Sequence, residues 1–263
     1  MISLNHKIKT IVADKKSWLC VGLDMNPELL GTENFSDLKN HTLKVIDATR
    51  DFAVAYKPNF AFFERWGAAG FSWLEETVDY IGPDYIKIAD AKRGDIGNTA
   101  MQYAESIFNH FGFDSVTLSP YMGKDSIEPF LTKPNKGAFI LCRTSNPSAK
   151  DLQNIVVGNK PIYQIVVEMV ESLNQYDNIG LVVGATAPSE LVEIRDLVCD
   201  LPLLIPGVGA QGGDLRHCLK VGNSTGVALI NISRGISFSG DMSNKTIYNT
   251  AYHYVAKMQE AFD

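Results

Sequence analysis

Charged side chains of both signs crowd residues 90–95, where the sequence reads Asp-Ala-Lys-Arg-Gly-Asp. This segment follows a short apolar run that begins at Tyr85, which is typical of a buried strand. Because side chains alternate along a strand, we expect Asp90 and Lys92 on one face, with Asp95 just beyond the strand. Surface ion pairs are the simpler interpretation, but charges beside a buried strand lose water and need partners. Fixed charges of this kind can act on the charge that develops in a transition state.

A second lysine stands in another apolar run. Lys57 lies within residues 54–63 and could join the first cluster in an alternating set of two ammoniums and two carboxylates. A lone strand-end lysine that reaches out to water is the alternative. We expect the set of four, Lys57, Asp90, Lys92 and Asp95, to be catalytic.

Two later segments have the composition of a phosphate site. Residues 206–213 form a glycine-rich loop whose backbone N–H groups could face an anion, and Gln211 adds a donor. Arg234 and Gly235 follow the apolar run at 227–232, and arginine can pair with phosphate through two parallel hydrogen bonds. The glycines alone would equally fit a tight loop that needs positive φ angles. The arginine favours the anion site.

Eight short apolar runs recur along the chain, and polar residues follow at least six of them. The runs cover residues 18–24, 54–63, 85–90, 115–120, 138–144, 180–186, 203–209 and 227–232. Successive runs start about 30 residues apart, which is the size of a βα unit. Helical spacing fills residues 35–50, 65–81, 98–111, 161–176 and 188–198, and a final amphipathic helix is expected at 248–262.

Eight βα units make a (β/α)8 barrel. Its active site lies at the carboxyl ends of the strands, and anions often bind the loops after strands seven and eight. We therefore predict an α/β fold, a (β/α)8 TIM barrel, as a single catalytic domain over residues 1–263. The main alternative is a doubly wound open sheet, but the GxGxxG fingerprint that such a sheet carries after its first strand is absent.

Composition limits the kind of protein further. The chain has 263 residues, 45% of them apolar and 21% charged, with a net charge of −6, as in ordinary globular proteins. This mild acidity predicts no nucleic-acid partner, and no apolar run is long enough to span a membrane. The N-terminal residues carry scattered charges rather than the apolar core of a secretory signal. No cysteine pair has zinc-like spacing, so we expect a reduced, cytoplasmic protein without a metal site.

The chain resembles the orotidine 5′-phosphate decarboxylase family, in its longer bacterial branch. The eleven residues 90–100, DAKRGDIGNTA, match the signature of that branch, which is far more specific than any single glycine motif. Further matches cover residues 21–24, 55–64, 143–147, 206–214 and 233–235. The resemblance thus extends over most of the chain.

This resemblance implies decarboxylation of orotidine 5′-phosphate to UMP and CO2 in pyrimidine biosynthesis, without a metal or cofactor. It implies that Lys92 donates a proton to C6 of the pyrimidine and that Asp90 sits beside the departing carboxylate. Lys57 and Asp95 would complete the charge network. A fixed ammonium suits this reaction, because loss of CO2 leaves a localised anion on a ring carbon.

The resemblance also implies a set of binding residues. Asp24 would bind the ribose, Ser145 the pyrimidine amide, and Gln211, Arg234 and Gly235 the phosphate. The residues Asp95, Ile96 and Thr99 would reach into the site of a partner, so a homodimer with shared active sites is expected. Residues 146–160 form a candidate lid, because they are polar and follow the fifth strand.

Three other functions remain as alternatives. Related barrels such as hexulose-phosphate synthase use an Asp-x-Lys-x-x-Asp motif with magnesium, but by resemblance they carry an acidic residue at the position of Lys57. A Schiff-base lyase would need a lysine of lowered pKa, which flanking carboxylates oppose. A phosphate-binding protein without activity would explain Gln211 and Arg234 but leave the four charged residues without a role.

Overall fold

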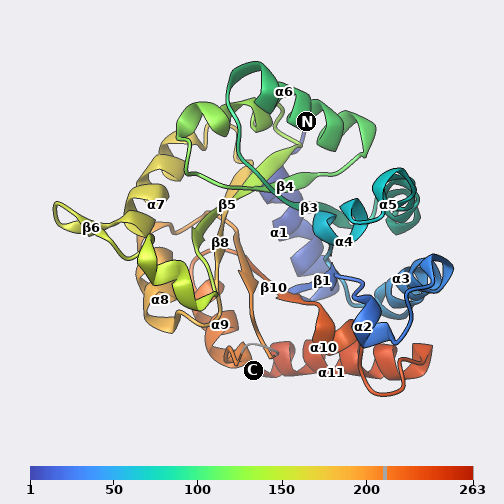
Figure 1. Cartoon of the computed structure of the whole chain (residues 1–263). Coiled ribbons are helices and arrows are strands. Elements are labelled where there is room, and N and C mark those ends of the chain that lie inside the picture. The colour runs from blue at the N-terminus through green and yellow to red at the C-terminus, as the bar shows by residue number, and fades with distance from the viewer. Residues whose placement is uncertain (210–211, 263) are drawn as a thin grey trace.

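Eight parallel strands close into a barrel in the computed structural model, which describes residues 1–209 and 212–262. The spatial order is β1-β10-β9-β8-β5-β4-β3-β2, with the remaining two strands in a separate hairpin (Figure 1). The barrel strands are β1 (Leu19–Leu23), β2 (Ala55–Pro58), β3 (Ile86–Arg93), β4 (Ser115–Leu118), β5 (Gly137–Arg143), β8 (Ile179–Val183), β9 (Leu203–Pro206) and β10 (Ala228–Ile232). Each lies within or overlaps one predicted run, and the predicted (β/α)8 barrel is confirmed.

Most helices surround the strands as an outer ring, whereas α1 (Leu4–Lys15) lies at the centre of the view, across one end of the barrel (Figure 1). The other helices are α2 (Pro27–Leu30), α3 (Phe35–Thr49), α4 (Phe60–Glu64), α5 (Gly67–Ile81), α6 (Gly97–Glu105), α7 (Ile162–Leu173), α8 (Pro188–Leu197), α9 (Leu215–Gly222), α10 (Arg234–Ser237) and α11 (Asn244–Glu260). A π-helical turn over Ser106–His110 continues α6. Predicted helices match α3, α5, α6, α7, α8 and α11, with ends that differ by a few residues.

Five helices have no counterpart among the predicted ones: α1, α2, α4, α9 and α10. The longest of them is α1. Leu4, Ile8 and Val12 of α1 are buried and belong to the same apolar cluster as the inward side chains of the strands, among them Ile88 and Phe139. The helix therefore closes the amino-terminal end of the barrel. Only this narrow stripe of α1 is apolar, so its helical period is weak in the sequence.

Two connections also depart from a regular βα repeat. The apolar run at 54–63 divides, because β2 ends at Pro58 and the Asn59 side chain accepts a hydrogen bond from the Ala61 N–H to begin α4. Between β4 and β5 the chain forms two short 3-10 turns, Lys124–Ser126 and Glu128–Phe130, instead of an α-helix.

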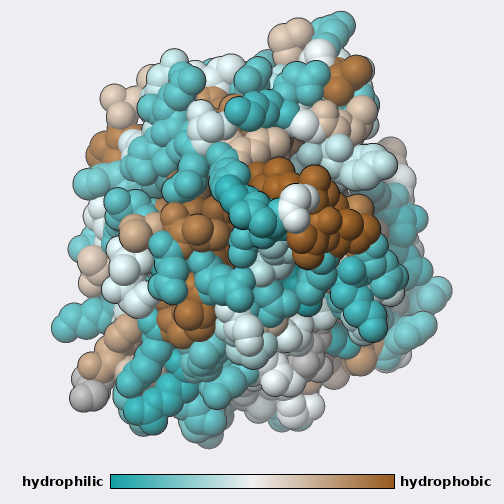
Figure 2. All heavy atoms as spheres, turned by 90° about the vertical axis from the view of Figure 1, so that its left-hand side faces the viewer, coloured by the Kyte–Doolittle hydropathy of each residue, from teal (hydrophilic) through white to brown (hydrophobic). Residues whose placement is uncertain are grey.

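The candidate lid forms a projecting segment after β5. A 3-10 turn at Pro147–Asp151 leads into the hairpin of β6 (Val156–Val157) and β7 (Lys160–Pro161), which extends from the left of Figure 1. Several of its apolar side chains are exposed, and Figure 2 shows brown, apolar groups gathered on this face among hydrophilic ones. The exposed apolar side chains of this segment are Leu152, Ile155, Val156 and Val157.

None of the helices in the described ranges has the length and apolar character that a membrane crossing requires.

Candidate active site

Two oppositely charged side chains are buried at the carboxyl ends of β2 and β3. Lys57 is 4% and Asp90 8% exposed, and Lys57 Nζ lies 2.5 Å from Asp90 Oδ2. Their neighbours explain this placement, since Tyr56 and Ala89 pack toward the outer helices while Ala55 and Ile88 face the barrel interior. Strand alternation therefore turns Lys57 and Asp90 inward, toward each other.

The buried pair is ionised at neutral pH. Burial alone would lower the pKa of Lys57, but Asp90 and Asp24 outweigh it and hold that pKa above its usual range. Burial alone would raise the pKa of Asp90, but the ammoniums of Lys57 and Lys92 hold it well below its usual range. Each charge therefore keeps the other ionised inside the barrel.

Lys92 completes a chain of three charges at the barrel mouth. Its Nζ lies 2.6 Å from Asp90 Oδ1, and its side chain is 52% exposed, so its ammonium sits at the boundary between the network and solvent. A cavity of about 420 Å³ begins there, lined by Lys57, Asp90 and Lys92 and reaching Ser145 and Pro206 across the barrel. Asp90 thus presents its carboxylate to this cavity between two ammoniums.

The fourth predicted member, Asp95, does not join this network within one chain. Asp95 is half-buried in the loop after β3, and its Oδ1 accepts a hydrogen bond from the Ile96 N–H at 2.8 Å. Ile96 and Thr99 are exposed beside it, at the start of α6. The three residues expected to reach a partner therefore lie together on the surface.

Asp24 and Ser145 lie on opposite sides of the barrel mouth. Asp24 follows β1, and its Oδ1 is buried without a hydrogen-bond partner among the described residues. Ser145 lines the cavity after β5, where the Thr186 hydroxyl donates to its carbonyl at 3.1 Å. A Cβ on Gly184 would come within 2.7 Å of the Ser145 backbone nitrogen, so glycine is needed for this close approach.

The glycine-rich loop after β9 makes a tight turn. Gly207, Gly209 and Gly212 have φ angles of 97°, 75° and 84°, which favour glycine. The N–H groups of Gly212 and Gly213 donate to carbonyls within the loop, so these two amides are not free for an anion as the sequence analysis expected. Gln211 lies outside the described residues.

Arg234 opens α10 directly beyond β10, and its side chain is exposed. The neighbouring Gly235 has a packing role of its own, because a Cβ there would come within 2.9 Å of the Tyr254 hydroxyl. The same hydroxyl would lie 3.2 Å from a Cβ on Gly209. The Tyr254 hydroxyl of α11 therefore lies close to both loops that were expected to hold phosphate.

Sequence reasoning missed two polar residues that line the cavity, Thr117 and Gln153. The Thr117 hydroxyl donates to Asp90 Oδ1 at 3.1 Å, and the signal for it was its inward position on β4. The Gln153 amide accepts from the Thr144 N–H and donates to the Thr144 hydroxyl, both at 2.8 Å. No local pattern marks this second contact, because it joins the lid segment to the end of β5.

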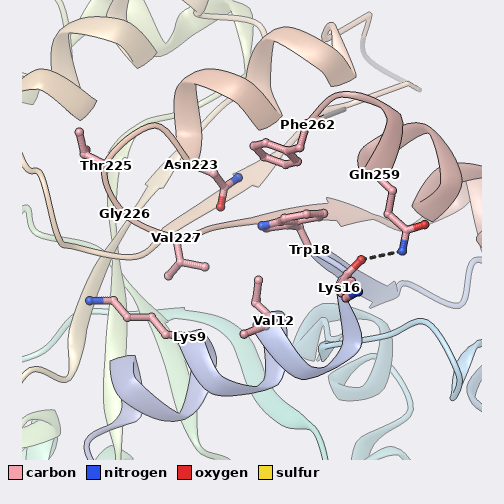
Figure 3. Close-up of a pocket in the computed structure, with 11 residues that line it drawn as sticks. Lys9, Val12, Lys16, Trp18, Asn223, Thr225, Gly226, Val227, Gln259 and Phe262 are labelled. Atoms are coloured by element: carbon pink, nitrogen blue, oxygen red, sulfur yellow. Dashed lines mark hydrogen bonds between the residues drawn. The ribbon is translucent and has the colours of Figure 1, made fainter.

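A larger cavity of about 590 Å³ lies at the opposite end of the barrel, before the first residues of β1 and β10 (Figure 3). Figure 3 shows the rings of Trp18 and Phe262 together, with centroids 4.6 Å apart, and Gln259 donating to the Lys16 carbonyl. No carboxylate lines this cavity among its described residues. In the described part of the chain, no group of three or more His, Cys, Asp or Glu side chains is placed to hold a metal ion.

Residues 17–246 match the sequence model of one protein family, described as Orotidine 5′-phosphate decarboxylase / HUMPS. The chain belongs to this family. A relative in the family, the orotidine 5′-phosphate decarboxylase of Natronomonas pharaonis, is 49% identical over 235 residues, which cover 88% of this chain and 86% of that protein. The protein of the same name from Christiangramia forsetii is 45% identical over 240 residues, which cover 89% of this chain and 88% of that one.

Solved structures of the family agree with the barrel. The OMP decarboxylase of Leishmania donovani has a TM-score of 0.89 at 36% identity and covers 99% of each chain. The UMP synthase of the same organism has a TM-score of 0.90 at 38% identity, covering 99% of this chain but only 57% of that longer one. The family resemblance expected from residues 90–100 is thereby confirmed.

Proposed function

We infer that this chain is an orotidine 5′-phosphate decarboxylase, a carboxy-lyase that forms UMP and CO2 in pyrimidine biosynthesis. The observation that carries this inference is the buried Lys57–Asp90 pair with Lys92 at 2.6 Å from the same carboxylate. The family also holds magnesium-dependent barrels, which by resemblance carry an acid where this chain has Lys57. An ammonium beside a magnesium site would repel the metal, so Lys57 favours the decarboxylase.

The reaction follows from the placement of charge. The substrate carboxylate sits near Asp90, and two carboxylates about 4 Å apart repel by about 4 kcal/mol at an effective dielectric of about 20. The bond between C6 and the carboxylate breaks, CO2 leaves, and the electron pair stays on C6. The Lys92 ammonium stabilises this anion and then donates a proton to C6, which yields UMP and a neutral amine that water reprotonates.

The remaining predicted residues supply binding. We propose that the unpartnered Asp24 Oδ1 accepts a hydrogen bond from a ribose hydroxyl and that Ser145 contacts the pyrimidine. Arg234, with Gly235 and Gln211, holds the phosphate, whose binding energy serves to position the reacting ring. Residues 1–263 act as one catalytic domain, and a cytoplasmic location stays a prediction.

A Schiff-base lyase is the weaker candidate. Its lysine must lose a proton to attack a carbonyl, whereas Asp90 and Asp24 raise the pKa of Lys57. Borohydride should therefore fail to trap a covalent adduct between the protein and a phosphorylated substrate.

The test of the proposed function is direct. The purified chain is mixed with orotidine 5′-phosphate in the presence of EDTA, and the change in ultraviolet absorbance is followed. We propose that no metal or cofactor takes part, so turnover should persist with the chelator. If EDTA abolished the turnover of an active preparation, the reaction would need a metal, contrary to the proposal. If the folded protein showed no turnover at all, the proposed function would be wrong.

We further propose a homodimer in which Asp95, Ile96 and Thr99 complete the partner's site. Lys92→Ala and Asp95→Asn chains, each inactive alone, should then regain about one quarter of the wild-type activity when mixed in equal amounts. Random exchange makes half of the dimers mixed, and each mixed dimer holds one intact site of two. Subunit exchange is checked with differently tagged chains, and proven exchange without recovery would show that the sites are not shared.

A further inference from the structure

The hydroxyl of Thr117 joins the two residues to which the decarboxylase reaction gives the largest roles. Thr117 lies on β4, faces the barrel interior and is 2% exposed. It donates to Asp90 Oδ1 at 3.1 Å and accepts a hydrogen bond from the Lys92 backbone N–H at 3.0 Å. One hydroxyl can do both, because it has one proton and two lone pairs.

The backbone of Lys92 shows why this contact matters. Its φ angle is 46°, in the left-handed region that non-glycine residues disfavour. The pairing of β3 with β4 is interrupted at the same point, since Ala89 pairs with Val116 and the next pair is Arg93 with Leu118. Three residues of β3, numbers 90 to 92, therefore lie opposite Thr117 alone.

This bulge decides where the lysine side chain points. A bulge re-aims side chains and leaves backbone groups without their regular ladder partners. At Lys92 the N–H instead donates to the Thr117 side chain, while Lys92 Nζ reaches Asp90 at 2.6 Å. Without the hydroxyl, the Lys92 N–H would lose its acceptor. Asp90 accepts hydrogen bonds from Lys57, Lys92 and Thr117, and it would lose the only one of these donors that carries no charge.

We propose that Thr117 is a positioning residue for the proton donor. It holds the Lys92 backbone in the left-handed conformation and fixes the Asp90 carboxylate. Together these contacts fix the position of the Lys92 ammonium at the edge of the cavity. This inference rests on the proposed decarboxylase function for its kinetic consequence, whereas its structural part concerns the free protein alone.

The barrel offers a matched control. Ser115 lies two residues earlier on β4, faces the same interior and is fully buried, but its hydroxyl has no hydrogen-bond partner in the described ranges. Ser115→Ala removes an inward hydroxyl from the same strand without touching Lys92 or Asp90. Thr117→Val removes the hydroxyl and keeps the shape, and Thr117→Ser keeps the hydroxyl.

The first measurement is the single-turnover rate of decarboxylation. Thr117→Val should lower this rate by about 10- to 100-fold, with the Kd for UMP changed by less than about threefold. The single-turnover rates of Thr117→Ser and Ser115→Ala should both lie within about threefold of the wild-type rate. A Thr117→Val rate close to the wild type, or an equal loss in Ser115→Ala, would overturn the inference.

The second measurement does not depend on activity. In protein labelled with 15N-lysine, Thr117→Val should speed hydrogen exchange of the Lys92 amide by at least about 10-fold, and Ser115→Ala should leave it unchanged. Unchanged exchange in Thr117→Val would overturn the inference even if the rate falls. Thr117→Ala serves the same purpose if the valine variant does not fold, as circular dichroism would show. A wild-type protein without turnover would refute the proposed function, and amide exchange would still decide the role of Thr117.

Discussion

Lys92→Ala is expected to lower kcat by at least about 10⁴-fold, because in the proposed mechanism this one group both stabilises the carbanion and donates the proton. The Kd for UMP should change by less than about tenfold, since we propose that the phosphate is held by Arg234 on the other side of the barrel. The rate is measured by ultraviolet absorbance and the Kd by titration calorimetry.

A second lysine on the same strand provides the control. Lys87 has the opposite strand parity, and it lies near Lys136 rather than in the cavity that Asp90 and Lys92 line. Lys87→Ala should keep kcat within about threefold of the wild type. If Lys92→Ala instead retains the wild-type rate, the proton comes from another group and the proposed mechanism is wrong.

Asp90→Asn should lower the free energy of unfolding by about 3–5 kcal/mol, because it leaves the Lys57 ammonium buried without its nearest counter-charge. The double variant Lys57→Met with Asp90→Asn removes both charges and should be more stable than Asp90→Asn alone. Both are measured by urea unfolding at neutral pH, with circular dichroism as the signal. A double variant that is the less stable of the two would show that the buried charge is not what costs stability.

The effect of Asp90→Asn on the free energy of unfolding should depend on pH. The pKa of Asp90 is lower in the folded chain than its ordinary value of about 3.9, so its ionisation stabilises the fold fully above that value. This stabilisation is lost as the pH falls below about 4 through the depressed folded pKa. The gap in unfolding free energy between wild type and Asp90→Asn should therefore narrow as the pH falls from about 4 to about 2. A gap that widens would contradict the assignment.

The barrel was predictable because each strand is buried on both faces and appears as a continuous apolar run. Strand parity also placed Asp90 and Lys92 on one side, although the real backbone reaches this result through the bulge opposite Thr117. A bulge has no sequence period, so the contact from the Thr117 hydroxyl was not predicted. This contact joins two residues that are 25 positions apart, so it can be recognised only when the pairing of β3 with β4 is known.

Other parts of the site depend on atoms beyond local sequence. Asp95 was expected in the charge network, yet within one chain its carboxylate binds only the adjacent Ile96 N–H among the described residues. The family resemblance assigns it to a partner's site, which no strand pattern could reveal. Gln153 likewise anchors to Thr144 through a contact between two loops, and loop conformation is set by such contacts rather than by hydrophobic spacing.

The part of the chain that matches the family's sequence model is shorter than the part that must fold together. The family match begins at residue 17 and ends at 246, which leaves out α1 and most of α11. Burial of Leu4, Ile8 and Val12 alone contributes roughly 5–9 kcal/mol, as much as the whole net stability of many domains. A fragment cut at the limits of the match would expose the amino-terminal end of the barrel to water. It would also remove most of the helix whose Tyr254 packs close to the two loops that we propose to bind phosphate. Boundaries of sequence similarity are therefore poor guides to where this enzyme can be truncated.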